Sequence, residues 1–80
     1  MEPAAILSGL TGLFREILDD DGLELTPETS AANVPGWDSM NHITIVVEVE
    51  RRFGVKFQTS EIEELRNVGE LIALIARKAR

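Results

Sequence analysis

Residues 38–54, DSMNHITIVVEVERRFG, form the segment on which the fold depends. As a strand, the segment alternates apolar and polar side chains between Ile43 and Val49 and is rich in β-branched residues. As a helix, it starts at an N-cap, either Asp38 or Ser39, and stops at Gly54. The positions that share one face of that helix are Met40, Ile43, Val46, Val47, Glu50 and Phe53. Periodicity fits both structures and leaves the choice open.

The segment before it contains a clear helical pattern. Residues 3–18 predict an amphipathic helix with Pro3 in its first turn, and residues 19–22, Asp-Asp-Asp-Gly, end it. Its apolar residues recur at three- and four-residue spacing: Ile6, Leu7, Leu10, Leu13, Phe14, Ile17 and Leu18. Residues 19–37 then predict a long ordered loop, with a single helical turn at residues 26–29. The apolar residues that can pin this loop to the core are Leu23, Leu25, Val34 and Trp37.

Two further helices are predicted after Gly54. Residues 59–65 have a capping signature, Thr59 or Ser60 followed by Glu63 or Glu64, and predict a short helix. Residues 67–79 predict the last helix, with Asn67 as its N-cap. Its apolar face consists of Val68, Leu71, Ile72, Ile75 and Ala76.

Composition limits the classes of function. With 80 residues the chain is expected to form one domain, residues 1–80. The sequence contains no cysteine, which excludes disulfides, thiolate zinc sites and a thiol nucleophile supplied by the chain. Residues 1–50 contain ten acids and one base, and the net charge of -6 argues against binding nucleic acid. No apolar run approaches the roughly 20 residues that span a bilayer. No signal peptide is recognisable, so we expect a monomeric cytoplasmic protein without membrane insertion.

Ser39 is the candidate for chemistry. The single histidine, His42, lies three residues further along the same segment, and this spacing does not fit a hydrolase triad. The acids at 19–21 are typical of a solvated loop, and no calcium loop or glycine-rich phosphate loop is present. Ser39 therefore has two interpretations. It is a helix N-cap, or it is a modification site whose helix N-terminus favours an attached phosphate.

From Asp38 onward the sequence resembles the acyl carrier protein family, which includes peptidyl and D-alanyl carriers. Asp38-Ser39-Met40 stands where the family usually has Asp-Ser-Leu. The resemblance continues through Phe53-Gly54 and residues 55–57, and closes at Asn67-Val68-Gly69-Glu70-Leu71, the start of the last helix. Segment lengths agree along nearly the whole chain.

The resemblance implies an all-α fold, a small four-helix bundle with a long loop between its first two helices. It therefore favours the helical alternative for residues 39–53, where packing overrides β propensity. It also implies that Ser39 receives 4'-phosphopantetheine from coenzyme A, transferred by a phosphopantetheinyl transferase. The thiol of that arm would hold acyl groups as thioesters, and the protein would be a carrier rather than an enzyme.

Residue roles follow from the same resemblance. Asp38 helps the transferase to recognise the serine, and Met40 contacts partner enzymes beside the arm. The expected partners are acyl-activating, acyl-transferring or condensing enzymes. The expected partner face consists of Met40, Asn41, Thr44, Val47, Glu48 and Arg51. The residues expected to face the core are Ile43, Val46, Phe53, Ile62, Leu71 and Ile75.

The sequence departs from common fatty-acid carriers along this second helix. Those carriers place acids on its exposed face, whereas this chain has Asn41, Thr44 and the basic Arg51. Since partner choice depends on the sum of such charges, we expect a specialised carrier of a lipid, polyketide or acylation pathway. Trp37 is expected to anchor the loop, and His42 to lie at the helix surface without a special role.

Two alternatives remain open at this level. One is an aminoacyl carrier of the D-alanyl or peptidyl type, which shares the same prosthetic group. The other is a helical adaptor without a prosthetic group, in which Ser39 is only a helix cap and the acidic half of the chain binds a basic partner.

Overall fold

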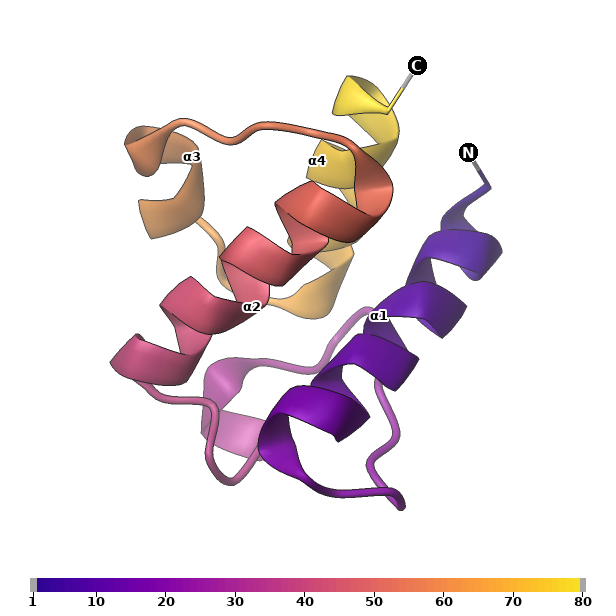
Figure 1. The fold of residues 1–80 in the computed structure, drawn as a ribbon, viewed down its shortest axis with the longest axis vertical. Helices are drawn as coiled ribbons and strands as arrows, with labels where there is room; N and C mark the ends of the chain where they lie inside the picture. Colours follow the sequence, from indigo (N-terminus) through magenta and orange to yellow (C-terminus); the bar gives the residue numbers. More distant parts are fainter. Residues whose placement is uncertain (1, 80) are drawn as a thin grey trace.

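The computed structural model describes residues 2–79, and the described chain is helical throughout its regular elements (Figure 1). The elements are α1 (Pro3–Leu18), the 3₁₀ helix η1 (Ala31–Asn33), α2 (Ser39–Phe53), α3 (Thr59–Glu63) and α4 (Val68–Lys78). α1 packs against both α2 and α4, while the short α3 lies on the side of α2 away from α1 (Figure 1). The predicted all-α four-helix bundle is confirmed.

The ambiguous segment is a helix that is capped at both ends. At the N-terminus Asp38 Oδ1 accepts a hydrogen bond from Asn41 N at 2.9 Å. At the C-terminus Gly54 adopts a left-handed conformation with φ 67°, and its N–H bonds to the carbonyl of Glu50. Burial of β-branched side chains against other helices outweighs the few tenths of a kcal/mol per residue, roughly, by which they disfavour a helix.

The buried face of α2 differs from the predicted face. Ile45, Val46 and Val49 are buried, whereas Ile43 is 57% exposed and Val47 53% exposed. The expectation that Ile43 faces the core is therefore wrong. Apolar residues occur on both sides of this helix, so their spacing alone does not tell which side packs against α1.

The core is built from α1, α2, α4 and the long loop, with Val55 added from the segment after α2. Its buried members are Ile6, Leu10, Leu13, Phe14, Leu25, Val34, Ile45, Val49, Val55, Val68, Leu71, Ile72 and Ile75. Phe53 is half-buried against this cluster, as are Leu23 and Trp37 of the loop. The four predicted loop anchors therefore do pack against the core. Ile62, also expected in the core, lies outside the cluster and is half-buried.

The long loop is fixed to the first turn of α4. The carbonyls of Thr29 and Pro27 accept hydrogen bonds from the N–H groups of Val68 and Gly69, each at 2.8 Å. These two donors would otherwise lack partners, because they belong to the first turn of a helix. A Cβ at Gly69 would lie 3.0 Å from the carbonyl oxygen of Pro27, so glycine permits this close approach.

Local details of the loop and of α3 differ from the prediction. The expected helical turn at residues 26–29 is a tight turn in which Thr29 N donates to Thr26 O. The 3₁₀ helix η1 was not predicted. α3 ends at Glu63 rather than at residue 65, and its cap is Gln58 rather than Thr59 or Ser60. Asn67 caps α4 as predicted, through a hydrogen bond from Glu70 N.

Glu61 holds α3 to α4. Its carboxylate accepts a hydrogen bond from Gln58 N at 2.8 Å and pairs with Lys78 Nζ at 3.0 Å and Arg77 Nη2 at 3.8 Å. The bond from the Gln58 backbone and then the contact with Lys78 lower the pKa of Glu61 below its ordinary value of 4.5. A carboxyl with a lowered folded pKa stabilises the fold above its unfolded pKa, and this contribution is lost as pH falls through the folded value.

Glu61→Gln should therefore make the free energy of unfolding less dependent on pH in the acidic range. Between neutral pH and about pH 3, the free energy of unfolding should fall less in Glu61→Gln than in the parent chain. Urea unfolding at a series of pH values measures this. Glu64→Gln, an exposed position at the end of α3, is the control and should keep the parental slope. Equal slopes for the parent and Glu61→Gln would contradict the assignment.

Alanine substitutions at two glycines of α1 should differ in their effect on the free energy of unfolding. Gly12 is exposed, and a Cβ there meets no atom within 4 Å. Gly12→Ala should raise the free energy of unfolding by about 1 kcal/mol through helix propensity. A Cβ at Gly9 would lie 2.9 Å from Phe53 Cζ, so Gly9→Ala must displace that ring and should gain little or lose stability. Thermal and urea unfolding of both variants check this, and an equal gain would show that Gly9 is not a contact point between α1 and α2.

Candidate functional site

Ser39 is the first residue of α2 and is exposed. The N-cap of the helix is Asp38, so of the two cap candidates the structure selects Asp38. The Ser39 hydroxyl makes no hydrogen bond to any other described residue. The serine is thus available at the start of a helix whose capping does not require it.

The turn before Ser39 is held by its neighbours. Asn41 Nδ2 donates to the carbonyl of Gly36 at 2.6 Å, and Gly36 has φ 89°, a conformation that favours glycine. Asn41 thus donates to Asp38 through its backbone N–H and to Gly36 through its side chain. The two hydrogen bonds fix the loop to the first turn of α2. Asn41, expected on the partner face, is half-buried and engaged in this turn.

Trp37 links the turn to the core and to His42. Its indole Nε1 donates to His42 Nδ1 at 3.1 Å, and its ring meets Phe14 edge-on with centroids 4.9 Å apart. The expected anchoring role of Trp37 is confirmed. His42, expected at the helix surface without a special role, is half-buried and accepts this hydrogen bond through Nδ1.

A pocket of about 500 Å³ opens beside Ser39, between α2 and the segment that follows α3. Its apolar lining residues are Ala31, Trp37, Ile43, Ile62, Leu65 and Leu71. Its polar lining residues are Asp38, Ser39, His42, Glu63, Arg66 and Asn67. Ile43 and Ile62, which do not join the core, thus both face this pocket. A volume in this range, with apolar side chains beside polar groups, is typical of a small-molecule site.

Several pocket residues were not found from the sequence. Ala31 comes from the unpredicted 3₁₀ helix, and Arg66 comes from the connection between α3 and α4. Asn67 was identified only as a helix cap. No local pattern distinguishes these residues, because the long loop and the connection after α3 bring them beside Ser39 from distant parts of the sequence.

The exposed side of α2 carries an apolar stripe. Met40, Ile43 and Val47 are 82%, 57% and 53% exposed, and their spacing places them along one face. We call these three residues the α2 stripe. It begins one residue after Ser39, and exposed large apolar side chains in a row are typical of a surface that meets another molecule.

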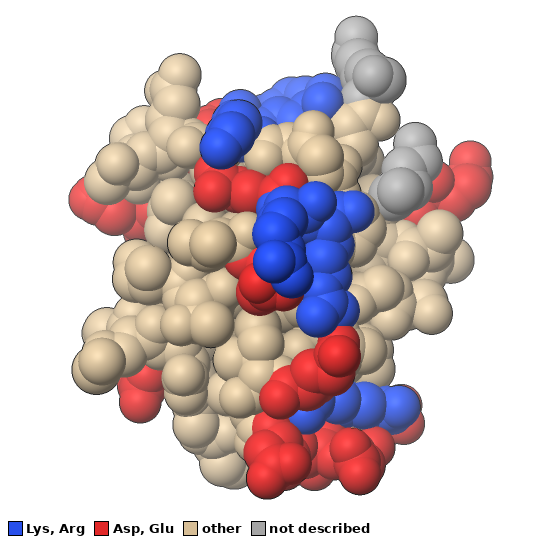
Figure 2. All heavy atoms as spheres, viewed as in Figure 1, with Lys and Arg blue, Asp and Glu red and all other residues tan. Residues whose placement is uncertain are grey.

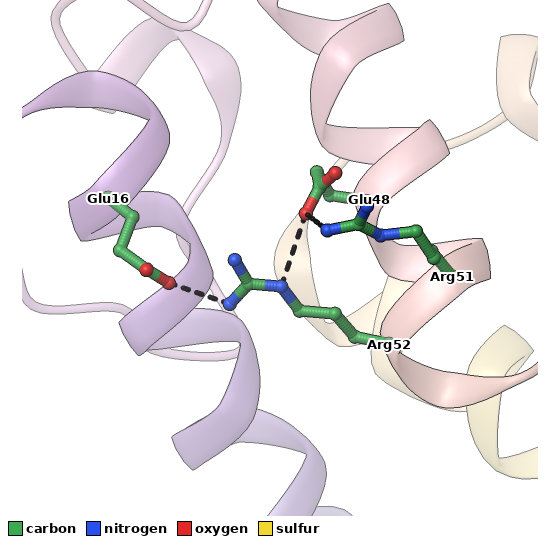
Figure 3. A network of polar contacts seen from close by, with 4 residues as sticks. All are labelled: Glu16, Glu48, Arg51 and Arg52. Atoms are coloured by element: carbon green, nitrogen blue, oxygen red, sulfur yellow. Dashed lines mark hydrogen bonds and ion pairs between the residues drawn. The ribbon is translucent and has the colours of Figure 1, made fainter.

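Glu48 and Arg51 of the predicted partner face join Arg52 and Glu16, which were not predicted there, in a network at the far end of α2 (Figure 3). Glu48 accepts contacts from Arg51 Nη2 at 3.4 Å and Arg52 Nε at 3.2 Å. Arg52 Nη1 also reaches across to Glu16 of α1 at 2.6 Å. The hydrogen bond and charge of Arg52 lower the pKa of Glu16, and Glu16 in turn raises the pKa of Arg52.

The described residues offer no metal centre and no membrane-spanning helix. Within residues 2–79, no three His, Cys, Asp or Glu side chains gather closely enough to hold a metal ion. No helix in this range is both long and apolar enough to cross a bilayer. The arrangement around Ser39 therefore offers an accessible hydroxyl, free helix N–H groups and a pocket.

Known proteins resemble this chain in both sequence and fold. The family profile described as "Phosphopantetheine attachment site" matches residues 8–75. A meromycolate extension acyl carrier protein of Mycolicibacterium aurum is 32% identical over 72 residues, which are 90% of this chain and 74% of the relative. An acyl carrier protein of Acidothermus cellulolyticus is 31% identical over 71 residues, 89% of this chain and 84% of that one.

Two solved structures superimpose closely. The solution structure of holo acyl carrier protein from Geobacter metallireducens has a TM-score of 0.84 and 42% identity, covering 90% of this chain and 83% of that chain. The crystal structure of an acyl carrier protein from Thermotoga maritima has a TM-score of 0.85 and 24% identity, covering 98% and 91%, and shows the shared fold.

These matches agree with the all-helical fold and with the order of its helices. The prosthetic group of such proteins is 4'-phosphopantetheine, and they work with a phosphopantetheinyl transferase and acyl-handling enzymes. The chain belongs to the acyl carrier protein family and is a phosphopantetheine-binding carrier rather than an enzyme.

Proposed function

We propose that Ser39 is the residue that bears 4'-phosphopantetheine. The observation that carries this proposal is the free, exposed hydroxyl of Ser39 at the N-terminus of α2, beside the apolar pocket. Three other serines are described, Ser8, Ser30 and Ser60, and none of them lines this pocket.

The surroundings of Ser39 suit a phosphodiester. The backbone N–H groups of Ser39 and Met40 donate to no acceptor among the described residues, as expected for the first turn of a helix. Such free donors and the positive end of the helix dipole favour a phosphate at this position. The nearby carboxylate of Asp38 is directed to Asn41 N, which leaves these two donors available.

The arm supplies what the chain lacks. When bound, 4'-phosphopantetheine provides a thiol that holds an acyl group as a thioester, and the sequence has no cysteine of its own. The apolar residues of the pocket can shelter part of the cargo, while the tether raises the local concentration of cargo at a partner's active site.

We propose a dedicated lipid pathway as the setting. The curated relatives include carriers named for meromycolate extension, which supports lipid cargo over an aminoacyl group. Acyl-activating, acyl-transferring or condensing enzymes would dock on α2 through the stripe and the neighbouring Thr44, Glu48 and Arg51. Residues 1–80 would act as one carrier domain, in the cytoplasm where coenzyme A donates the arm.

Loading of the arm tests the attachment site. Incubation with coenzyme A, magnesium and a broad-specificity phosphopantetheinyl transferase should add one phosphopantetheine to the parent chain and none to Ser39→Ala, measured by intact mass. Ser60→Ala, at an exposed serine of α3, is the matched control and should load fully. Loading of Ser39→Ala, or no loading of the parent by a transferase active on another carrier, would overturn the assignment.

Ser39→Ala should also fold normally. Because Asp38 supplies the cap and the Ser39 hydroxyl has no partner, its replacement should change the free energy of unfolding by less than about 0.5 kcal/mol. This outcome separates the carrier from the adaptor alternative, in which the serine matters only as a cap.

Two substitutions separate the charge of Asp38 from its capping role. Asn accepts the same hydrogen bond from Asn41 N, so Asp38→Asn should preserve stability, while Asp38→Ala should cost about 1 kcal/mol. If the carboxylate is recognised by the transferase, both variants should load more slowly than the parent. Urea unfolding and initial loading rates measure the two effects. A normal loading rate in Asp38→Asn would limit Asp38 to capping.

A further inference from the structure

The exposed side of α2 changes character along its length. Near Ser39 it presents the uncharged α2 stripe together with Thr44, and at its far end it presents arginine. Figure 2 shows the same change, since largely uncharged surface covers the N-terminal half of α2 and basic side chains gather over its C-terminal end.

The acids of this helix are already bound within the molecule. Glu48 is held by Arg51 and Arg52, and its side chain is only 23% exposed. Glu50 accepts a hydrogen bond from Phe57 N at 2.8 Å. Along α2 itself, neither carboxylate is left free to meet a basic partner.

Arg51 is the most exposed charge of the network in Figure 3. Its side chain is 74% exposed, and among residues 2–79 it pairs with Glu48 alone, at a long 3.4 Å. Arg52 is less exposed, at 40%, and is neutralised by two carboxylates, those of Glu16 and Glu48. Glu16, an exposed acid of α1, is itself held by Arg52 at 2.6 Å.

The helix sets the distance between this cation and the attachment site. Twelve residues separate Ser39 from Arg51, which corresponds to about 18 Å along a helix axis. A partner that receives the arm at Ser39 and lies along the stripe therefore meets Arg51 about 18 Å from its arm entrance.

We propose that the acyl-handling partner of this chain has an apolar groove that receives the α2 stripe. Carboxylates of the partner at the end of that groove meet Arg51. This proposal rests on the proposed function, because it concerns the enzyme that receives cargo from Ser39. Burial of Met40, Ile43 and Val47 supplies affinity, and the cation selects among partners. A partner with a basic docking surface meets like charge at Arg51 and finds no free carboxylate on α2, so it is disfavoured.

A pair of matched enzymes tests the proposal. The probe is a condensing enzyme of fatty-acid synthesis chosen for a carrier-docking surface of lysines and arginines, together with a variant whose basic residues there are replaced by glutamate. The hexanoyl-loaded holo-protein is the substrate of each enzyme form, and kcat/KM of each form for this substrate is measured. The parent chain should react at least about threefold faster with the glutamate form, and added salt should reduce this preference.

Three variants locate the effect. Arg51→Glu should abolish or reverse the preference, whereas Arg77→Glu, an exposed base on α4, should leave it unchanged while altering net charge equally. Val47→Asn should lower kcat/KM with both enzyme forms alike. Circular dichroism checks that each variant folds.

The outcomes distinguish this proposal from the proposed function. If the holo-protein forms at Ser39 but both enzyme forms use it equally, or the basic form uses it faster, the docking proposal is overturned and the carrier function stands. An equal effect of Arg77→Glu would reduce the preference to net charge and would also overturn it. If no holo-protein forms, the proposed function itself fails.

Discussion

The burial of Ile45 and Val49 between α2 and the other helices is the interaction on which the structure depends. These β-branched residues favour a strand locally, and only their removal from water in the bundle makes the helix the stable form. Once α2 is helical, Ser39 stands at a helix N-terminus and the α2 stripe faces outward. The position of Ser39 and the exposure of the α2 stripe are thus consequences of a single tertiary contact.

Part of this structure can be predicted from local sequence. Pro3, Gly54 and Asn67 mark helix ends through chemistry that lies within a few residues, and all three occupy the expected positions. The strand or helix choice at residues 39–53 required the family resemblance, because it depends on distant residues. The orientation of α2 depended on its partners in the same way, which is why Ile43 was wrongly expected in the core.

The candidate site likewise contains residues that the sequence identifies and residues that only the structure identifies. Ser39 and Asp38 stand out in the sequence because they follow one another before a helix. The pocket cannot be recognised in the sequence, since Ala31, Ile62 and Arg66 come close to Ser39 only in the folded chain. The hydrogen bond of Trp37 to His42 was missed for a different reason: five residues apart, they meet because the turn at Gly36 brings the indole over the first turn of α2.

That hydrogen bond has an experimental consequence. Trp37 is the only tryptophan of the chain, and the sequence contains no tyrosine. Its indole lines the pocket beside Ser39 and is bonded to His42. The tryptophan fluorescence of the protein therefore comes from one ring beside Ser39. A change in the polarity around this ring, or in its quenching, should report in real time and without a label whether cargo lies in the pocket or has left it for a partner.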